Sequence, residues 1–220
     1  MTPERMRASI AELLYPGSLR CAFCKSRDVA AGAHFCGACL DALGAQGARL
    51  IDAGAPIDGA VAAHLYAGQA GAIVRAFKYH GISALAREMG ADVRRAMVDV
   101  NLPRPDLLAF VPMHWARRRM RMFNHAELIA ASVAAGMGMR AETLIRRVRP
   151  ARRQAMLVTP AARAKNVRAA FRATRELGGA RVLLIDDVYT TGATARECAR
   201  ALKVGGAGAV YLAVYALGGG

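Results

Sequence analysis

The chain has 220 residues, enough for one substantial domain and a small additional module. Its 31 lysines and arginines outnumber its 16 acidic residues, and the resulting net charge of +15 predicts polyanionic partners. No stretch is long and apolar enough for a transmembrane helix, and the first residues lack the apolar core of a signal peptide. We therefore expect a globular cytoplasmic protein without membrane insertion.

Two pairs of cysteines stand out in the first 50 residues. Cys21 and Cys24 form one Cys-x-x-Cys knuckle, and Cys36 and Cys39 form the second. Two such knuckles fit a tetrahedral site in which four thiolates bind zinc. Too few large apolar side chains precede position 50 for this region to fold unaided, which also favours a metal. We predict a short helix over 7–14 and a structural zinc ribbon, together forming a module over 1–50, with free thiols or a redox pair as the alternative.

Two further residues carry related chemistry. His34 lies inside the second knuckle, and we interpret it as a loop residue because the four cysteines complete the site. Cys198 has Ala195, Ala199 and Leu202 at helical spacing, which is typical of a core position.

Beyond the cysteines, strands and helices are predicted to alternate. Residues 44–56 are rich in alanine and glycine and suit a linker. Strands are predicted at 60–66, 107–111, 143–148, 182–185 and 209–217, an extended segment at 167–171, and helices at 72–79, 83–100, 126–135 and 159–165. This alternation predicts an α/β domain over 57–220 with a mostly parallel central sheet.

The segment from Val182 to Thr194 is the most informative in the chain. An apolar strand is followed by Asp186 and Asp187, at the carboxyl end where open α/β sheets bind ligands. Small residues then let backbone N–H groups close on a phosphate, and the next helix adds its positive dipole. These loop residues are Thr190, Thr191, Gly192, Ala193 and Thr194. The two carboxylates can accept hydrogen bonds from a diol, and the adjacent loop can bind a phosphate, so the segment fits a ribose 5-phosphate. The alternative interpretation is a helix-capping turn with acidic residues on the surface.

This segment resembles the phosphoribosyl pyrophosphate (PRPP) signature of type I phosphoribosyltransferases. The resemblance implies that Asp186 and Asp187 are the catalytic pair holding the ribose 2′- and 3′-hydroxyls, that the residues 190–194 hold the 5′-phosphate, and that Mg²⁺ accompanies PRPP. Purine salvage members place a carboxylate at the position of Thr190, where it handles the proton of the base. A threonine cannot abstract a proton at neutral pH. A hypoxanthine or guanine acceptor is therefore disfavoured, and no acceptor can be named.

Further segments resemble the ComF family, phosphoribosyltransferase-like proteins with an N-terminal zinc ribbon. Besides the cysteine pairs, they include Phe77-Lys78-Tyr79-x-Gly81, Val111-Pro112 and Arg163-x-x-Asn166. The family's usual Arg-Gly-Phe-Asn-Gln appears here as residues 121–125, Arg-Met-Phe-Asn-His. The resemblance covers essentially the whole chain and implies a type I phosphoribosyltransferase fold. We assign no catalytic role to His114 or His125, because a loop histidine more often serves as a hydrogen-bonding group.

The resemblance also places residues 112–121 where type I phosphoribosyltransferases bind pyrophosphate. Arginine forks and Mg²⁺ would neutralise the charge that develops on this leaving group. The arginines there are Arg117, Arg118, Arg119 and Arg121. The alternative is a solvated basic loop. Residues 152–154 and 163–168 fall where the family's mobile loop closes over PRPP.

Two classes of function stay open. ComF-like proteins are associated with natural competence, the uptake and handling of single-stranded DNA. The protein is either an enzyme that transfers phosphoribosyl from PRPP to an unknown acceptor, or a non-catalytic component that binds single-stranded DNA or docks on DNA-uptake proteins through the zinc ribbon and arginine clusters. Binding of a phosphoribosyl ligand is the firmer prediction. A homodimer fits the resemblance too, because this fold commonly pairs.

Overall fold

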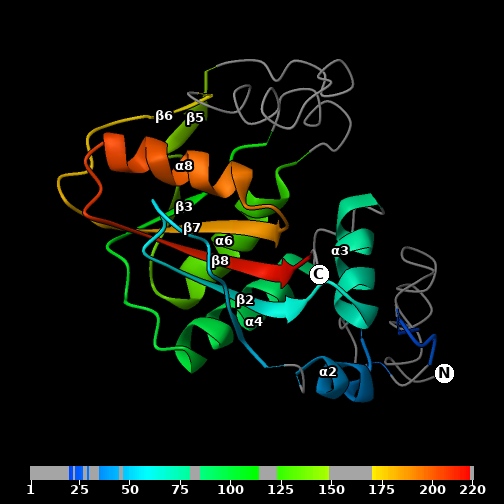
Figure 1. Cartoon of the computed structure of the whole chain (residues 1–220). Helices are drawn as coiled ribbons and strands as arrows, with labels where there is room; N and C mark the ends of the chain where they lie inside the picture. Colours follow the sequence, from blue (N-terminus) through cyan, green and yellow to red (C-terminus); the bar gives the residue numbers. More distant parts are fainter. Residues whose placement is uncertain are drawn as a thin grey trace.

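The computed structural model describes residues 20–21, 23–26, 29, 35–44, 47–79, 85–113, 123–148 and 170–218 (Figure 1). The predicted helices over 7–14 and 159–165, the arginines between 117 and 121, the segments 152–154 and 163–168, and His34 and His114 lie outside these residues. No helix in the described part of the chain has both the length and the apolarity to cross a bilayer.

A central sheet organises the described residues. Its strand order is β1-β2-β8-β7-β3-β4, and every neighbouring pair is parallel except β1 and β2. The strands span Arg49–Leu50 (β1), Gly59–Leu65 (β2), Leu107–Phe110 (β3), Ala141–Glu142 (β4), Arg181–Tyr189 (β7) and Ala209–Leu217 (β8). The prediction of an α/β fold with a mostly parallel sheet is confirmed.

Helices cover both faces of this sheet, which explains why its central strands are almost wholly apolar. Helix α8 (Ala193–Val204) packs on β7 and β8 from one side. Helices α4 (Leu85–Asp99) and α6 (His125–Gly136) pack against each other and against β2, β8, β3 and β7 from the other side (Figure 1).

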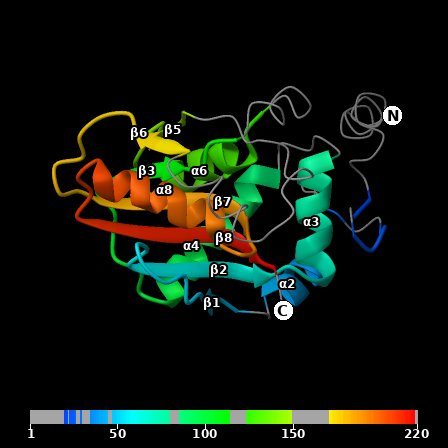
Figure 2. The ribbon, with the colours of Figure 1, turned by 45° about the horizontal axis from the view of Figure 1, so that its top comes forward.

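Three smaller elements lie around the sheet. Helix α3 (Gly68–Tyr79) stands across the carboxyl ends of β2 and β8, with α2 (Gly37–Gly44) beside it (Figure 2). A separate antiparallel ribbon pairs β5 (Ile145–Arg147) with β6 (Phe171–Ala173) and packs on α8. The carboxyl edge of the sheet therefore faces α3.

Several boundaries differ from the predictions. The predicted linker over 44–56 contributes an edge strand, because Arg49 and Leu50 pair with Ala62 and Val61. The predicted helix over 72–79 begins at Gly68, four residues earlier, where glycine and glutamine conceal the helical periodicity. The predicted strand over 143–148 is shorter, and β4 precedes it as a separate two-residue strand.

Candidate functional site

The two acids lie on the last part of β7. Pairing of β7 with β8 continues past Ile185 to Tyr189, with Asp186 opposite Val214. The strand therefore does not end at Ile185 as predicted, because the long parallel neighbour keeps the backbone extended through both acids. Asp186 and Asp187 nonetheless lie at the carboxyl edge of the sheet, where parallel α/β sheets bind their ligands.

A lysine from another element completes this pair. The Nζ atom of Lys78, in the last turn of α3, lies 2.9 Å from Oδ1 of Asp187. The two side chains are 19% and 14% exposed, so the ion pair is partly shielded from water. Lys78 belongs to one of the segments that resemble the ComF family, but no role was predicted for it. One signal was available, since lysine occurs only four times in this arginine-rich chain.

Asp186 is in a different electrostatic state. Burial, and then the charge of Asp187, raise the pKa of Asp186 to about 8, although the charge of Lys78 acts in the opposite direction. Its Oδ1 atom accepts a hydrogen bond from the backbone N–H of Asp187 at 2.8 Å. The raised pKa favours the protonated form of Asp186, and in that form the carboxyl group can donate a hydrogen bond as well as accept one.

Gly192 shapes the loop that follows β7. Its φ of +69° lies in the left-handed region, and a Cβ atom there would collide with the hydroxyl of Tyr189 and the guanidinium of Arg196. Arg196 holds the loop from α8: its Nη2 donates to the carbonyl of Thr191 at 2.7 Å, and its Nη1 lies 3.1 Å from the Tyr189 hydroxyl. Only glycine fits this turn.

The loop leads directly into the start of α8 at Ala193. No side chain caps this helix, although the Ala193 N–H lies 3.5 Å from the Thr191 hydroxyl. The first N–H groups of a helix have no partner within the helix, and together with the dipole they favour an anion. Thr190, Thr191 and Thr194 are exposed. The predicted loop residues thus combine an open helix start with a fixed turn beside the acids.

The ends of β3 and α3 meet the start of α6 at this same edge. The side-chain amide of Asn124 donates to the carbonyl of Val111, just after β3, at 3.2 Å. His125 Nε2 lies 3.1 Å from the carbonyl oxygen of Phe77, next to Lys78. The residues on either side of 114–122 are therefore placed close to the acids, whereas the arginines predicted to bind pyrophosphate lie outside the described residues.

The four N-terminal cysteines come together as predicted. One ligand atom from each of Cys21, Cys24, Cys36 and Cys39 lies within 4.8 Å of all the others. Thiolates around a tetrahedral zinc ion, at a Zn–S distance of about 2.3 Å, lie about 3.8 Å apart. Backbone bonds shape the first knuckle: Cys21 N–H donates to Ser26 and Lys25 N–H to Cys21, with Lys25 at a φ of +63°. The cluster could bind a metal such as zinc.

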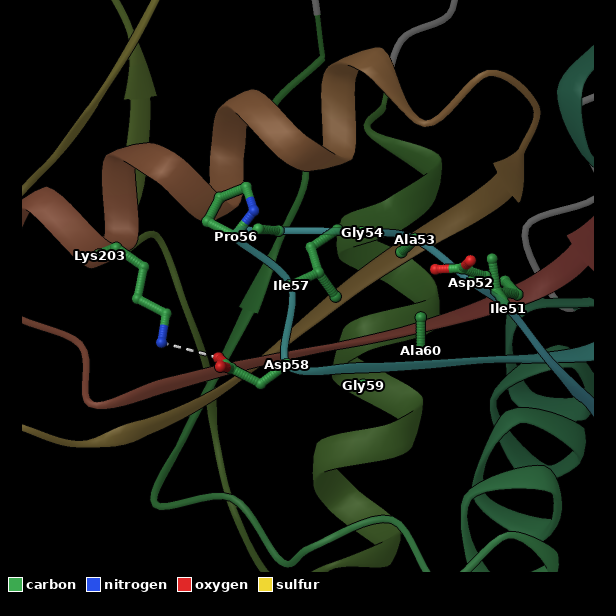
Figure 3. A pocket seen from close by; sticks show the side chains of 11 residues that line it. Ile51, Asp52, Ala53, Gly54, Pro56, Ile57, Asp58, Gly59, Ala60 and Lys203 are labelled. Carbon is green, nitrogen blue, oxygen red and sulfur yellow. Dashed lines mark ion pairs between the residues drawn. The ribbon is translucent and has the colours of Figure 1, made fainter.

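A pocket of about 390 Å³ lies beside α8, and neither Asp186 nor Asp187 lines it (Figure 3). Residues 51–60 and Lys203 line it, and none of them belongs to the predicted site. Lys203 Nζ lies 2.8 Å from Asp58, whose Oδ2 also accepts the N–H of Val210 at 2.7 Å. These bonds attach the segment before β2 to α8 and β8, so Asp58 and Lys203 already have structural partners.

No family model matches the chain, but it has relatives among known proteins. The chain is similar to DNA utilization proteins. It is 35% identical over 132 residues to the DNA utilization protein YhgH of Salmonella typhi, and 32% identical over 132 residues to that of Escherichia coli K12. These matches cover 59% of this chain and 57% of each relative, so the chain spans little more than half their length.

Two solved structures have a partial likeness. The glutamine PRPP amidotransferase from B. subtilis, complexed with ADP and GMP, aligns at a TM-score of 0.41 and 22% identity over 59% of this chain and 26% of its own. The allosteric regulatory enzyme of purine biosynthesis aligns at a TM-score of 0.40 and 20% identity over 60% of this chain and 26% of its own.

Proposed function

We propose that the protein is ComF-like and binds PRPP, or a related phosphoribosyl ligand, on a type I phosphoribosyltransferase domain. The observation that carries this proposal is the acid pair at the end of β7, which leads through the Gly192 turn to the uncapped start of α8. Hydroxyl acceptors and a phosphate cradle are adjacent there, as a ribose 5-phosphate requires. The domain would span 57–220, with β1 from the preceding segment completing the edge of its sheet.

The two acids would make different hydrogen bonds to the ribose hydroxyls. Protonated Asp186 can donate to one hydroxyl oxygen, and Asp187, held by Lys78, can accept from the neighbouring hydroxyl. The N–H groups at the start of α8 would take the 5′-phosphate. Arg117, Arg118, Arg119 and Arg121 would supply cationic donors for the pyrophosphate.

Mg²⁺ fits such a site because it prefers oxygen ligands and is usually bound largely through substrate phosphates and water. When bound, it would neutralise charge on the pyrophosphate that leaves during transfer. The protein's own residues would hold the ribose and the 5′-phosphate in place. With Thr190 at the position of the salvage carboxylate, transfer would need an acceptor that requires no proton abstraction there.

We also propose that the cysteine cluster holds a structural zinc ion and that the protein acts in DNA uptake in the cytoplasm. Four thiols rather than disulfides suit a reducing compartment. The DNA role is supported by the name of the relatives and by the net charge of +15. The alternative is a non-catalytic component that binds single-stranded DNA or docks on DNA-uptake proteins.

A thermal-shift experiment tests phosphoribosyl binding. We expect Mg²⁺ with PRPP to raise the melting temperature of the full chain, and Asp187→Asn to abolish the shift. Asp106→Asn is the matched control, because Asp106 is also ion-paired but lies at the opposite edge of the sheet. No shift at millimolar PRPP would contradict the proposal. Release of pyrophosphate with candidate acceptors separates an enzyme from a binding protein.

Binding of single-stranded oligonucleotide tests the alternative. Phosphate contacts predict an affinity that falls steeply with salt, and neutralising Arg117, Arg118, Arg119 and Arg121 should remove most of it. Retained affinity for DNA without any effect of PRPP on stability would favour the non-catalytic role. Competition between PRPP and DNA would place both polyanions at one surface.

A further inference from the structure

His125 is a buried histidine at the start of α6, with an exposed fraction of 2%. Its Nε2 atom lies 3.1 Å from the carbonyl oxygen of Phe77. A carbonyl oxygen can only accept, so the ring carries its proton on Nε2 and donates it there. The ring also makes edge-to-face contacts with Phe77 and Phe123, at centroid distances of 4.8 and 5.2 Å.

This hydrogen bond lies in the last turn of α3, where backbone carbonyls lack partners within the helix. The helix ends at Tyr79, and the last four carbonyls of a helix have no partner within it. Phe77 provides one of these carbonyls and immediately precedes Lys78, whose amine contacts Asp187. His125 therefore fixes the helix turn from which the lysine extends.

The start of α6 is itself fixed on the sheet. Asn124 donates to the carbonyl of Val111 at the end of β3, and α6 packs on both β3 and β7. The contacts form a closed path. It runs from β7 through α6 and His125 to Phe77 and Lys78, and returns to β7 at Asp187. The backbone of Lys78 and the backbone of Asp187 are thus both held by contacts with α6.

We propose that His125 is a positioning residue: its hydrogen bond to Phe77 holds the Lys78 amine against Asp187. Without this bond the last turn of α3 keeps only ring contacts with α6 at His125, and the backbone from which the flexible lysine side chain extends is held less firmly. The contact is a property of the folded chain. Its use in placing Asp187 for a ribose hydroxyl rests on the proposed function.

Two substitutions separate the hydrogen bond from packing. His125→Phe keeps an aromatic ring against Phe77 and Phe123 but removes the donor. His125→Gln loses the ring contacts but keeps an N–H donor on a side chain of comparable reach. If His125 only fills space, phenylalanine is the milder change. If it positions Lys78, glutamine is the milder change.

Amine acylation, read by mass spectrometry at each lysine, gives the measurement. Lys203 is the internal control, because it is also ion-paired, at 2.8 Å from Asp58, and lies far along the chain on α8. We expect His125→Phe to raise the acylation rate of Lys78 several-fold relative to Lys203, and His125→Gln to restore the rate towards that of the wild type. An unchanged ratio in folded His125→Phe would overturn the proposal.

A second measurement needs no stable variant. The ring nitrogens of the wild-type protein report the tautomer by NMR, and we expect His125 to carry its proton on Nε2; the other neutral tautomer would overturn the proposal. PRPP binding is measured alongside. If wild-type protein fails to bind PRPP, the proposed function fails, while the acylation ratio and the tautomer still decide the role of His125.

Discussion

Asp186 and Asp187 are neighbours in sequence, but the fold gives them different protonation behaviour. Asp187 has a lysine at 2.9 Å, whereas Asp186 is raised in pKa by burial and by the charge of Asp187. Two neighbouring acids that are partly shielded from water are most readily accommodated when only one is ionised. At the residue scale, the fold therefore favours the protonated form of Asp186 beside an Asp187 that is ion-paired with Lys78.

This arrangement predicts a stability cost that depends on pH. The pKa of Asp186 is about 8 in the folded protein, against an ordinary value of 3.8. Between pH 4 and pH 8 the folded state therefore binds more protons at this residue than the unfolded state does. Stability from this group is therefore full below about pH 4 and is lost progressively as the pH rises to 8. Asp186→Asn keeps an oxygen acceptor for the Asp187 N–H but cannot ionise.

We expect Asp186→Asn to gain stability over the wild type as the pH rises from 4 to 8, because the amide cannot ionise. Urea unfolding of both proteins across this range is the measurement. A difference between them that stays constant with pH would contradict the assigned protonation of Asp186.

Gly192 offers a second prediction at the residue scale. Gly192→Ala places a Cβ at a φ of +69° and against Tyr189 and Arg196. Gly138→Ala is the control, because Gly138 has nearly the same φ, +68°, with no atom within 4 Å of its added Cβ. Left-handed strain alone costs about 1–2 kcal/mol. We expect Gly192→Ala to cost clearly more than Gly138→Ala in chemical denaturation, and equal losses would show that the loop can relax.

At the scale of elements, the carboxyl and amino edges of the sheet differ in the polar side chains they carry. The carboxyl edge carries the acids, whereas the amino edge is clamped by Asp106, before β3, and Arg181, the first residue of β7. Arg181 makes two side-chain bonds to Asp106, at 2.8 and 3.0 Å, and its backbone N–H makes a third at 2.9 Å. These hydrogen bonds lower the pKa of Asp106 to about 2.

The clamp predicts acid sensitivity. A lowered folded pKa stabilises the protein above the ordinary value of 3.8, and this contribution is lost as the pH falls towards 2. Asp106→Asn should therefore destabilise the protein at pH 7 and make little difference near pH 2. Thermal unfolding of the two proteins at both pH values tests this, and an equal loss at both would indicate a role in packing rather than charge.

Long apolar elements were predictable from the sequence. The strand at 209–217 was predicted with the observed bounds, and β2 was displaced by a single residue, because buried parallel strands leave an unbroken apolar run. Strands β1 and β4 have two residues each, too few for any periodicity to appear. They form because a longer neighbour offers hydrogen bonds.

The same limit applies to the candidate site. Asp186, Asp187 and Gly192 were predicted as site residues because their types and order within one segment carry the chemistry. No role was predicted for Lys78, and His125 was expected to form a hydrogen bond with no partner specified, since their contacts join α3, α6 and β7 across long stretches of chain. Local patterns reveal what a segment can bind, but partners from other elements depend on the packing of the sheet.

At the scale of the whole molecule, the cysteine cluster is a second candidate site, separate from the acids on β7. Cys24 is exposed and belongs to the cluster, whereas Cys198 is buried on α8 outside it. Cys24→Ala should remove bound zinc from protein purified under reducing conditions, because three thiolates bind the ion less tightly. Cys198→Ala should retain it. Elemental analysis per chain is the measurement, and wild-type protein without metal would contradict a structural zinc site.

The segment over 47–58, before β2, determines where the chain can be shortened without exposing the sheet. Its strand β1 covers the edge of β2, and the carbonyl of Ala53 accepts a hydrogen bond from Arg196 at 3.4 Å. A shortened chain that starts at Pro56 or Ile57 would leave the N–H and C=O groups of β2 open to pairing with other molecules. It would also release one of the contacts of the arginine that holds the Gly192 turn. Dissection of the two sites should therefore cut before residue 47, so that self-association is not mistaken for a property of the intact protein.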